Sequence, residues 1–320
     1  MVRSGADLEA LVNLYRLEGG HVESDRALLQ CAYHTLDVVK KHGLSIVDVA
    51  SVVAAYAKTS GFKEVSCSLC DASCNTLNAA HTAGASVDDA IDILTAYAKG
   101  SRYAEWVSGL SKVTCQTLET LHKTGFSAAD IAMLVDCYAT HSAHDNTAAL
   151  LGDMVCRTIT TLSATGRKPG EALDLIKEYY RSSNREEWAS DLADATCTTL
   201  EALGGTEYTS RDAAAIIHSY SRASGRRERS AYLAAAACAT IEHMSQERID
   251  VDTIVGRIGS LHLDEMRENE HQHVVRKGDI VKRHFGPARW VLMLKEQHDF
   301  NQKAKVHRDA NEIAAMVFKE

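Results

Sequence analysis

The sequence contains little proline, few aromatic residues and no long hydrophobic run, and each of these absences narrows the possible structures. The chain has 320 residues, of which only two are prolines (Pro169 and Pro287) and 6% are aromatic. Because proline interrupts helices, its scarcity allows long helical stretches. Alanine, leucine and glutamate are common, which also favours helix. No stretch of about 18 apolar residues occurs, so we expect no transmembrane helix.

Short motifs that bind nucleotides or carry hydrolytic chemistry are also missing. The sequence contains no GxxxxGK[ST] loop, no GxGxxG after a strand, no GxSxG and no HExxH. Nothing in the residue pattern therefore indicates catalysis. We predict a protein that is not an enzyme and that needs no cofactor.

Nine cysteines are present, but their placement argues against a disulfide framework. Five of them recur at one repeat position, which is typical of packed thiols and not of bridges; they are Cys74, Cys115, Cys156, Cys197 and Cys238. Abundant free thiols indicate a reducing compartment. We also see no secretory signal.

Two groups of residues resemble metal ligands at first sight. Cys67, Cys70 and Cys74 lie in one expected helix without a second ligand pair, so core thiols are favoured over zinc, which usually needs four ligands. His141 and His144 fall in an expected turn with no carboxylate partner, and we interpret them as exposed turn residues. The sequence predicts no metal site.

The most informative pattern is a repeat of 41 residues without insertions. An acidic residue recurs and a tyrosine follows eight residues later each time, at Asp7/Tyr15, Asp48/Tyr56, Asp89/Tyr97, Asp130/Tyr138, Glu171/Tyr179 and Asp212/Tyr220. A threonine stands two residues after the cysteine column, at Thr35, Thr76, Thr117, Thr158, Thr199 and Thr240. A fixed period of 20 to 50 residues is typical of solenoids, in which stacked units bury a continuous core.

Each repeat reads as two helices. The acidic residue completes a capping box with the serine or threonine three residues earlier, in the pairs Ser45/Asp48, Ser86/Asp89, Ser127/Asp130 and Thr209/Asp212. The first helix of the second unit is expected over Ile46 to Lys58 and the second over Lys63 to Ala83, ending at Gly84. The tyrosine column is interpreted as an apolar spacer at the core edge, with its hydroxyl in water, in preference to a base-stacking platform.

These observations predict an all-α fold. We expect a right-handed α-solenoid of about seven helical hairpins over residues 1–262, followed by a helical or extended C-terminal extension over residues 263–320. The first unit starts at Ser4 and a degenerate seventh near Asp250, where Thr253 replaces the acid and Leu261 the tyrosine. Terminal units are usually atypical because they cap the stack.

Charge is distributed unevenly between these two parts. The formal net charge is −8, yet residues 271–320 contain ten Lys or Arg and six Asp or Glu, which is +4 and leaves −12 for the rest. Basic side chains with interleaved aromatics suit an RNA backbone and exposed bases. The predicted RNA-binding residues are Arg276, Lys277, Lys282, Arg283, Arg289, Trp290, Lys295, Lys303, Lys305 and Arg308. A solvated tail that pairs with the acidic body or with a protein neighbour fits equally well.

The first helix of each repeat resembles a known family pattern. Residues 48–57 (DVASVVAAYA), 89–98 (DAIDILTAYA) and 130–139 (DIAMLVDCYA) resemble the D-L-A-N-x-L-W-A-x-A helix of octatricopeptide and heptatricopeptide repeats. The family tryptophan is replaced here by Ala54, Thr95 or Asp136. The resemblance covers about residues 1–262 and implies an organellar α-solenoid of the kind that binds RNA or ribosomes.

The leading hypothesis is a non-enzymatic scaffold protein of the mitochondrial matrix, and specifically a mitochondrial ribosome component. Its solenoid would contact proteins, its tail would contact rRNA, and a targeting peptide is not visible in this numbering. One alternative is an RNA-free accessory subunit of a respiratory complex or ATP synthase. Another is an organellar RNA maturation factor, which the aspartates expected on the solvent-facing side of the first helices (Asp92, Asp136 and Asp174) disfavour by phosphate repulsion.

Overall fold

The computed structural model describes residues 4–21, 23–183, 187–224 and 228–260, and these residues are helical apart from the connections between helices. The described part of the chain contains no strand, only an isolated parallel bridge between Ser183 and Glu228. The prediction of an all-α fold is therefore confirmed. The whole predicted extension over residues 263–320, with every RNA-binding residue assigned to it, lies outside the described residues.

The described chain contains twelve helices, α1 to α12, in which odd-numbered and even-numbered helices form two alternating sets. Residues 251–260 are helical as well. The odd-numbered helices are α1 (Ser4–Glu18), α3 (Ile46–Thr59), α5 (Val87–Gly100), α7 (Ala128–His141), α9 (Pro169–Ser182) and α11 (Ser210–Ala223). The even-numbered helices are α2 (Asp25–His42), α4 (Ser66–Ala83), α6 (Val107–Thr124), α8 (Ala148–Thr165), α10 (Ala189–Leu203) and α12 (Ser230–Glu247). From α3 to α11, each odd-numbered helix begins 41 residues after the previous one.

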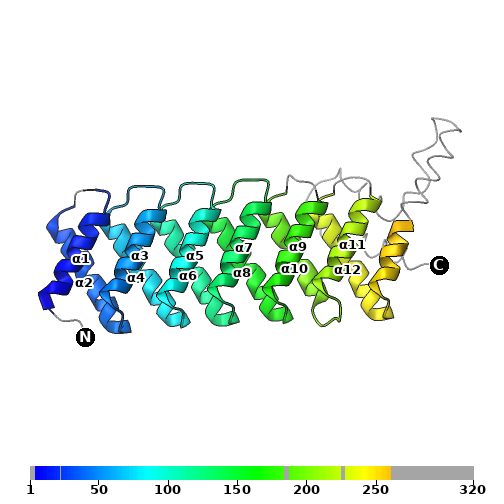
Figure 1. The fold of residues 1–320 in the computed structure, drawn as a ribbon, viewed down its shortest axis with the longest axis horizontal. Helices are drawn as coiled ribbons and strands as arrows, with labels where there is room; N and C mark the ends of the chain where they lie inside the picture. Colours follow the sequence, from blue (N-terminus) through cyan, green and yellow to red (C-terminus); the bar gives the residue numbers. More distant parts are fainter. Residues whose placement is uncertain (1–3, 22, 184–186, 225–227, 261–320) are drawn as a thin grey trace, which may run out of the picture. The chain divides into compact units, whose positions relative to one another are not determined.

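The helices form two compact units, which are described separately. Unit 1 comprises Met1–Thr140 and Asp145–Thr160, and unit 2 comprises His141–His144 and Thr161–Glu320. In unit 1, α3 packs between α1 and α5 in one layer, and α4 packs between α2 and α6 in a second (Figure 1). In unit 2, α9 packs on α11 and α10 on α12 in the same two-layer manner (Figure 1). Helical hairpins are thus the building blocks of each unit.

The odd-numbered helices begin where their capping residues require. Ser45 Oγ accepts a hydrogen bond from the Asp48 N–H at 3.1 Å, and Asp48 Oδ2 accepts one from the Ser45 N–H at 2.7 Å. Each of these bonds satisfies an N–H that the first turn leaves without a helical partner. The same reciprocal bonds occur at three further helix starts, in the pairs Ser86/Asp89, Ser127/Asp130 and Thr209/Asp212.

The core contains one repeated polar contact that the sequence interpretation described incorrectly. The six tyrosines of the repeat are nearly inaccessible to solvent, at 3% exposure or less. Each hydroxyl is hydrogen-bonded inside its own hairpin to the threonine 20 residues later, as between Tyr56 and Thr76 at 2.6 Å. The expectation that these hydroxyls reach water is therefore wrong, because the threonine column supplies a partner within the core.

The second helix of the second hairpin starts later than predicted. Helix α4 begins at Ser66, three residues after the expected Lys63. Lys63 and Glu64 belong instead to a loop whose backbone bonds to the preceding hairpin, as described below. At the last helical stretch the two residue types of the capping pair are exchanged, with the acid first and the hydroxyl residue three positions later. Asp250 accepts hydrogen bonds from both the N–H and the hydroxyl of Thr253. These two bonds lower the pKa of the Asp250 carboxyl.

Candidate functional site

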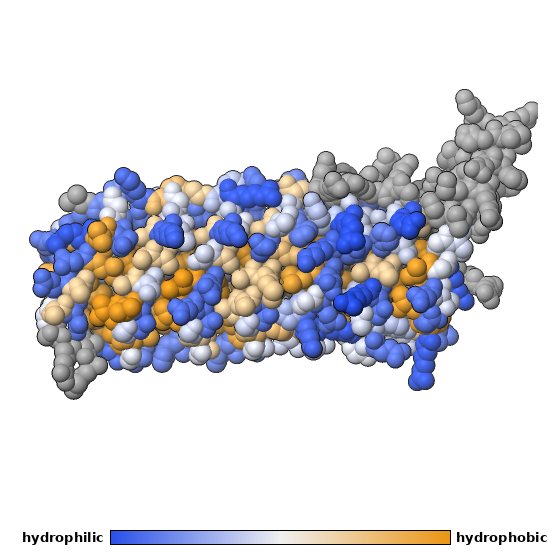
Figure 2. Space-filling view, in the orientation of Figure 1, coloured by the Kyte–Doolittle hydropathy of each residue, from blue (hydrophilic) through white to orange (hydrophobic). Residues whose placement is uncertain are grey.

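The loops that join each odd-numbered helix to the next even-numbered one form the most distinctive surface of each unit, which we call the loop edge. In unit 1 the loop edge consists of residues 19–21, 23–24, 60–65 and 101–106, and in unit 2 it includes residues 142–144 and 187–188. Large apolar side chains are exposed here, whereas most others are buried in the core. The face drawn in Figure 2 carries hydrophobic side chains between hydrophilic ones.

Backbone hydrogen bonds join consecutive loops of the edge. In unit 1 the Gly20 N–H donates to the Glu64 carbonyl at 2.7 Å, and the Gly61 N–H donates to the Glu105 carbonyl at 3.1 Å. The same donation, 44 residues along the chain, links Ala143 to Glu187 in unit 2 at 3.1 Å. A Cβ added to Gly61 would lie 2.4 Å from the Ala104 Cβ, so only glycine allows this approach. The edge is thus a fixed surface of each unit.

In four of these loops a buried or half-buried glutamate caps a helix of the following hairpin. Oε1 of Glu64 accepts the Val107 N–H at the start of α6 at 2.8 Å, and Oε1 of Glu105 accepts the Ala148 N–H of α8 at 2.8 Å. Equivalent bonds, also over 43 residues, are Glu23 to Ser66 in unit 1 and Glu187 to Ser230 in unit 2. A carboxylate at a helix N-terminus also complements the helix dipole.

These caps from a neighbouring hairpin explain an oddity of the even-numbered helices. The N-cap residues of α4, α6, α10 and α12 make no side-chain cap, and they are Val65, Trp106, Trp188 and Arg229. Such residues are poor caps in general, where serine, threonine or aspartate is preferred. For α4, α6 and α12 a glutamate 42 residues before the N-cap residue supplies the missing acceptor. The N-cap position of these helices therefore needs no capping side chain, and in α6 it carries the ring of Trp106.

Aromatic rings occupy the N-cap positions of α6 and α10 and stack with a ring of a neighbouring loop residue. In unit 1 the Phe62 and Trp106 rings are stacked with centroids 4.0 Å apart and an angle of 9° between planes. In unit 2 His144 and Trp188 are stacked at 3.9 Å and 17°. Trp106 is 53% exposed and Trp188 is 48% exposed, while Tyr103 of the same edge is 53% exposed. Each unit therefore presents an accessible indole at the same hairpin position.

The unit 1 edge and the helix ends next to it also carry exposed cationic side chains. Lys58, Lys63, Lys99 and Arg102 are exposed at the ends of α3 and α5 and in the loops that follow them. Arg102 forms an exposed ion pair with Asp145 at 3.4 Å. Cations beside accessible aromatic faces suit a partner with anionic groups and flat or apolar elements.

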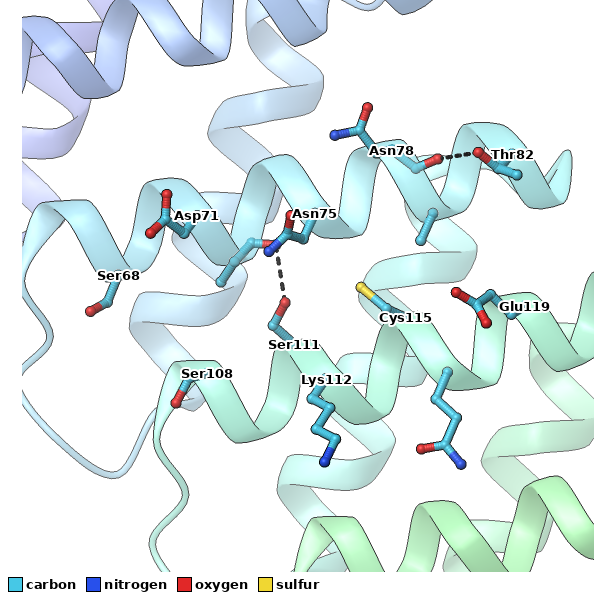
Figure 3. A pocket seen from close by; sticks show the side chains of 13 residues that line it. Ser68, Asp71, Asn75, Asn78, Thr82, Ser108, Ser111, Lys112, Cys115 and Glu119 are labelled. Atoms are coloured by element: carbon cyan, nitrogen blue, oxygen red, sulfur yellow. Dashed lines mark hydrogen bonds between the residues drawn. The ribbon is translucent and has the colours of Figure 1, made fainter.

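A groove lies between α4 and α6 and is shown in Figure 3. It is an open groove of about 770 Å³ lined mainly by small polar side chains. Ser111 Oγ donates to the Ala72 carbonyl across it at 3.3 Å, and Asp71, Lys112 and Glu119 bring charges of both signs to its walls. Mixed charge without an aromatic wall makes this groove a weaker candidate than the loop edge.

The residues that the sequence singled out occupy different places. The capping pairs lie at the starts of odd-numbered helices, and the basic residues from Arg276 to Arg308 lie outside the described residues. His141 is the last residue of α7 and packs edge-on against Tyr180 at 5.1 Å, and His144 belongs to the loop edge. Both are half-buried, so their interpretation as exposed turn residues is wrong. Cys70 and Cys74 are buried as expected, but Cys67 is exposed, which contradicts its interpretation as a core thiol. In the described part of the chain, no group of three or more His, Cys, Asp or Glu side chains is placed to hold a metal ion.

Sequence reasoning did not find the loop edge, although its signal was present. The glutamates at 23, 64, 105 and 187 keep the register of the repeat, and Trp106 and Trp188 stand two repeats apart.

No helix among the described residues combines the length and the apolar character needed to cross a membrane. No family model matches the sequence, and no curated protein matches it either.

Proposed function

We propose that the hairpins of both units continue one another as a right-handed α-solenoid of about seven 41-residue repeats. The proposal is supported by contacts that recur in each unit with the same spacing. The tyrosine to threonine bond always spans 20 residues, the glutamate cap 43 and the loop-to-loop bond 44. Stacking of such units creates an extended surface for macromolecules.

On this fold we propose a non-enzymatic scaffold of a mitochondrial RNA–protein assembly, and most specifically a mitochondrial ribosome component. The loop edge is the surface that contacts protein neighbours, and the basic extension is the part that contacts rRNA. The observation that carries the proposal is the recurrence of half-exposed tryptophans at one hairpin position. Tryptophan is enriched in the few residues that dominate interface energies, and two such rings without a structural capping duty favour a docking role.

The assembly itself provides the first test. Native extract of the source cells is sedimented with and without ribonuclease, and the chain is followed by antibody. We expect it in a large particle that ribonuclease disperses. A large particle that ribonuclease leaves intact would favour the second candidate, an RNA-free scaffold of a respiratory complex or ATP synthase. The exposed aspartates Asp92, Asp136 and Asp174 on the odd-numbered helices are the observation that favours this candidate.

The docking role of the loop edge is tested by point variants in the full chain. Trp106→Ala and Trp188→Ala are expected to reduce recovery of the particle by pull-down, by about ten-fold or more for an interface anchor that contributes about 2 kcal/mol. Tyr33→Ala is the matched control, because Tyr33 is 57% exposed but lies in α2, outside the loop edge. Equal recovery of all three variants would remove the role of the edge.

RNA contact by the extension is measured separately, with single-stranded RNA and the purified chain. Replacing Arg276, Lys277, Lys282 and Arg283 by glutamine is expected to weaken binding and to flatten its salt dependence, because fewer phosphates are neutralised. Unchanged affinity with an unchanged salt slope would show that the extension does not bind RNA, whatever particle the chain joins.

A further inference from the structure

Two cysteines of consecutive hairpins in unit 1 lie in contact and have no role in the scaffold described so far. Cys31 of α2 and Cys67 of α4 have their Sγ atoms 3.6 Å apart. Cys31 is 4% exposed, whereas Cys67 is exposed to solvent. Cys67 Sγ also lies 4.0 Å from Oε2 of Glu23, the residue that caps α4. The pair therefore connects a solvent-accessible thiol with a buried one beside a contact between two hairpins.

Packing alone does not require sulfur at these positions. At the place of Cys31, later repeats carry Ala72, Val113, Met154, Ala195 and Ala236. At the place of Cys67, they carry Ser108, Ala149, Ser190 and Ala231. Small apolar or hydroxyl side chains thus serve the same helix contacts elsewhere, and a thiol occurs at both places only once. Because two thiols coincide at one contact between hairpins, we explain the cysteines at these positions by the reactivity of sulfur and not by the volume of the side chains.

We propose that Cys31 and Cys67 form a reversible disulfide that covalently joins the first hairpin of unit 1 to the second. The oxidant class is a hydroperoxide. The Cys67 thiolate attacks one peroxide oxygen, the O–O bond breaks, and Cys67 becomes a sulfenic acid while one water or alcohol leaves. The Cys31 sulfur then attacks the Cys67 sulfur, the S–O bond breaks, and the hydroxyl leaves as water after taking up the thiol proton. Two thiols lose two electrons and two protons, and the peroxide is reduced.

The geometry assigns a different role to each thiol. Cys67 reacts first because it is the member that a dissolved oxidant can reach. Burial raises the pKa of the Cys31 thiol, which makes Cys31 a slow direct target of peroxide and leaves it as the resolving thiol. Bond formation requires the two sulfurs to approach by about 1.5 Å, since a disulfide is about 2 Å long. Cys70 is the nearest rival, but its Sγ is directed at the Cys31 carbonyl oxygen at 3.4 Å.

The bond would act as a reversible restraint in a reducing compartment. Disulfides of that environment are transient and respond to oxidant. The cross-link would join α2 to α4 next to the Glu23 to Ser66 cap, so the first two hairpins could no longer separate when either frays. An oxidised chain therefore keeps its N-terminal hairpin attached under conditions that open the reduced chain.

Peptide mapping of the full chain tests the assignment. The reduced chain is treated with hydrogen peroxide, free thiols are blocked with N-ethylmaleimide, and the protein is digested without reductant for mass spectrometry. We expect a pair of peptides joined through Cys31 and Cys67, lighter than the separate peptides by two hydrogens and separated again by dithiothreitol. Recovery of both residues in alkylated form after peroxide overturns the proposal, and so does a Cys31–Cys70 pair in equal or greater yield.

Conservative variants make the test independent of folding defects. Cys31→Ala and Cys67→Ser install residues that other repeats carry at those positions, and circular dichroism verifies their helicity. Both should lose the cross-link, and Cys31→Ala should accumulate several-fold more dimedone-trapped sulfenic acid at Cys67 than the native chain, because no resolving thiol remains. Cys115→Ser, which alters a half-buried thiol of α6, should leave the cross-link unchanged. Equal sulfenic acid in the native chain and in Cys31→Ala would show that Cys31 does not resolve it.

Discussion

The hydrogen bond between Tyr97 and Thr117 offers the most direct test of how each hairpin is held together. Tyr97 Oη lies 2.8 Å from Thr117 Oγ1, and both side chains are fully buried. Thr117 Oγ1 donates its own proton to the Val113 carbonyl at 2.8 Å. Because that proton is already used, the tyrosine must donate and the threonine must accept in the bond between them.

This direction makes the two single substitutions unequal. Tyr97→Phe removes the donor and leaves an acceptor whose own proton is still bonded, so it is expected to lower the free energy of unfolding by about 1 kcal/mol. Thr117→Val leaves the tyrosine hydroxyl buried with no acceptor, which is expected to cost about 1–3 kcal/mol. The double variant removes both polar groups and is expected to cost no more than Thr117→Val alone, a coupling of about 1–2 kcal/mol.

Urea unfolding of the four proteins measures these differences, and hydrogen exchange of the α5 and α6 amides localises them, because repeat arrays can unfold in parts. Tyr33→Phe serves as the control, since Tyr33 is exposed and its change should stay within about 0.5 kcal/mol. Strictly additive losses, or a Thr117→Val variant as stable as the native chain, would refute the assignment of donor and acceptor.

Three further perturbations test other contacts of the units. Glu64→Ala removes the carboxylate that accepts the Val107 N–H at 2.8 Å, so a loss of about 1–2 kcal/mol and faster exchange in the first turn of α6 are expected; unchanged exchange there would contradict the cap. Gly152→Ala places a Cβ 2.0 Å from Val113 Cγ2, so it should destabilise by about 1–3 kcal/mol despite alanine's better helix propensity, and Val113→Ala should restore most of the loss in the double variant. Burial raises the pKa of Tyr220 from 10.0 to about 12, so the unfolded chain loses this phenol proton at a lower pH than the folded chain does. The contribution of Tyr220 to the free energy of unfolding should therefore be constant below pH 10.0 and fall as pH rises towards 12. Tyrosinate absorbance and circular dichroism should change together in that range, and full stability at its upper end would contradict the burial argument.

Local chemistry accounts for what the sequence could predict. The starts of α3, α5, α7 and α11 follow from capping residues three positions apart, and the ends of α2, α4 and α6 follow from the glycines after them, which adopt positive φ. These signals lie within one turn of the helix that they define. The all-α class then follows from their regular spacing.

Contacts between hairpins could not be predicted in the same way. The carboxylate of Glu64 and the N–H of Val107 are 43 residues apart, and nothing local relates them until the hairpins pack. The same reason explains the misplaced start of α4, since its capping acceptor belongs to the preceding hairpin. The hydroxyls of the tyrosine column were assigned to water because their threonine partners lie on another helix, 20 residues away.

The glutamate that begins a helix in the following hairpin has a consequence for how such a chain can change length. Removing residues 46–86 from unit 1 would bring Val107 to the sequence distance from Glu23 that Ser66 has now, so an acceptor and a donor would again be matched. A deletion whose size is not a multiple of 41 residues would leave a carboxylate and an amide at the wrong sequence distance across the new junction. The chain can therefore be shortened or lengthened with its glutamate caps intact only by whole repeats of 41 residues.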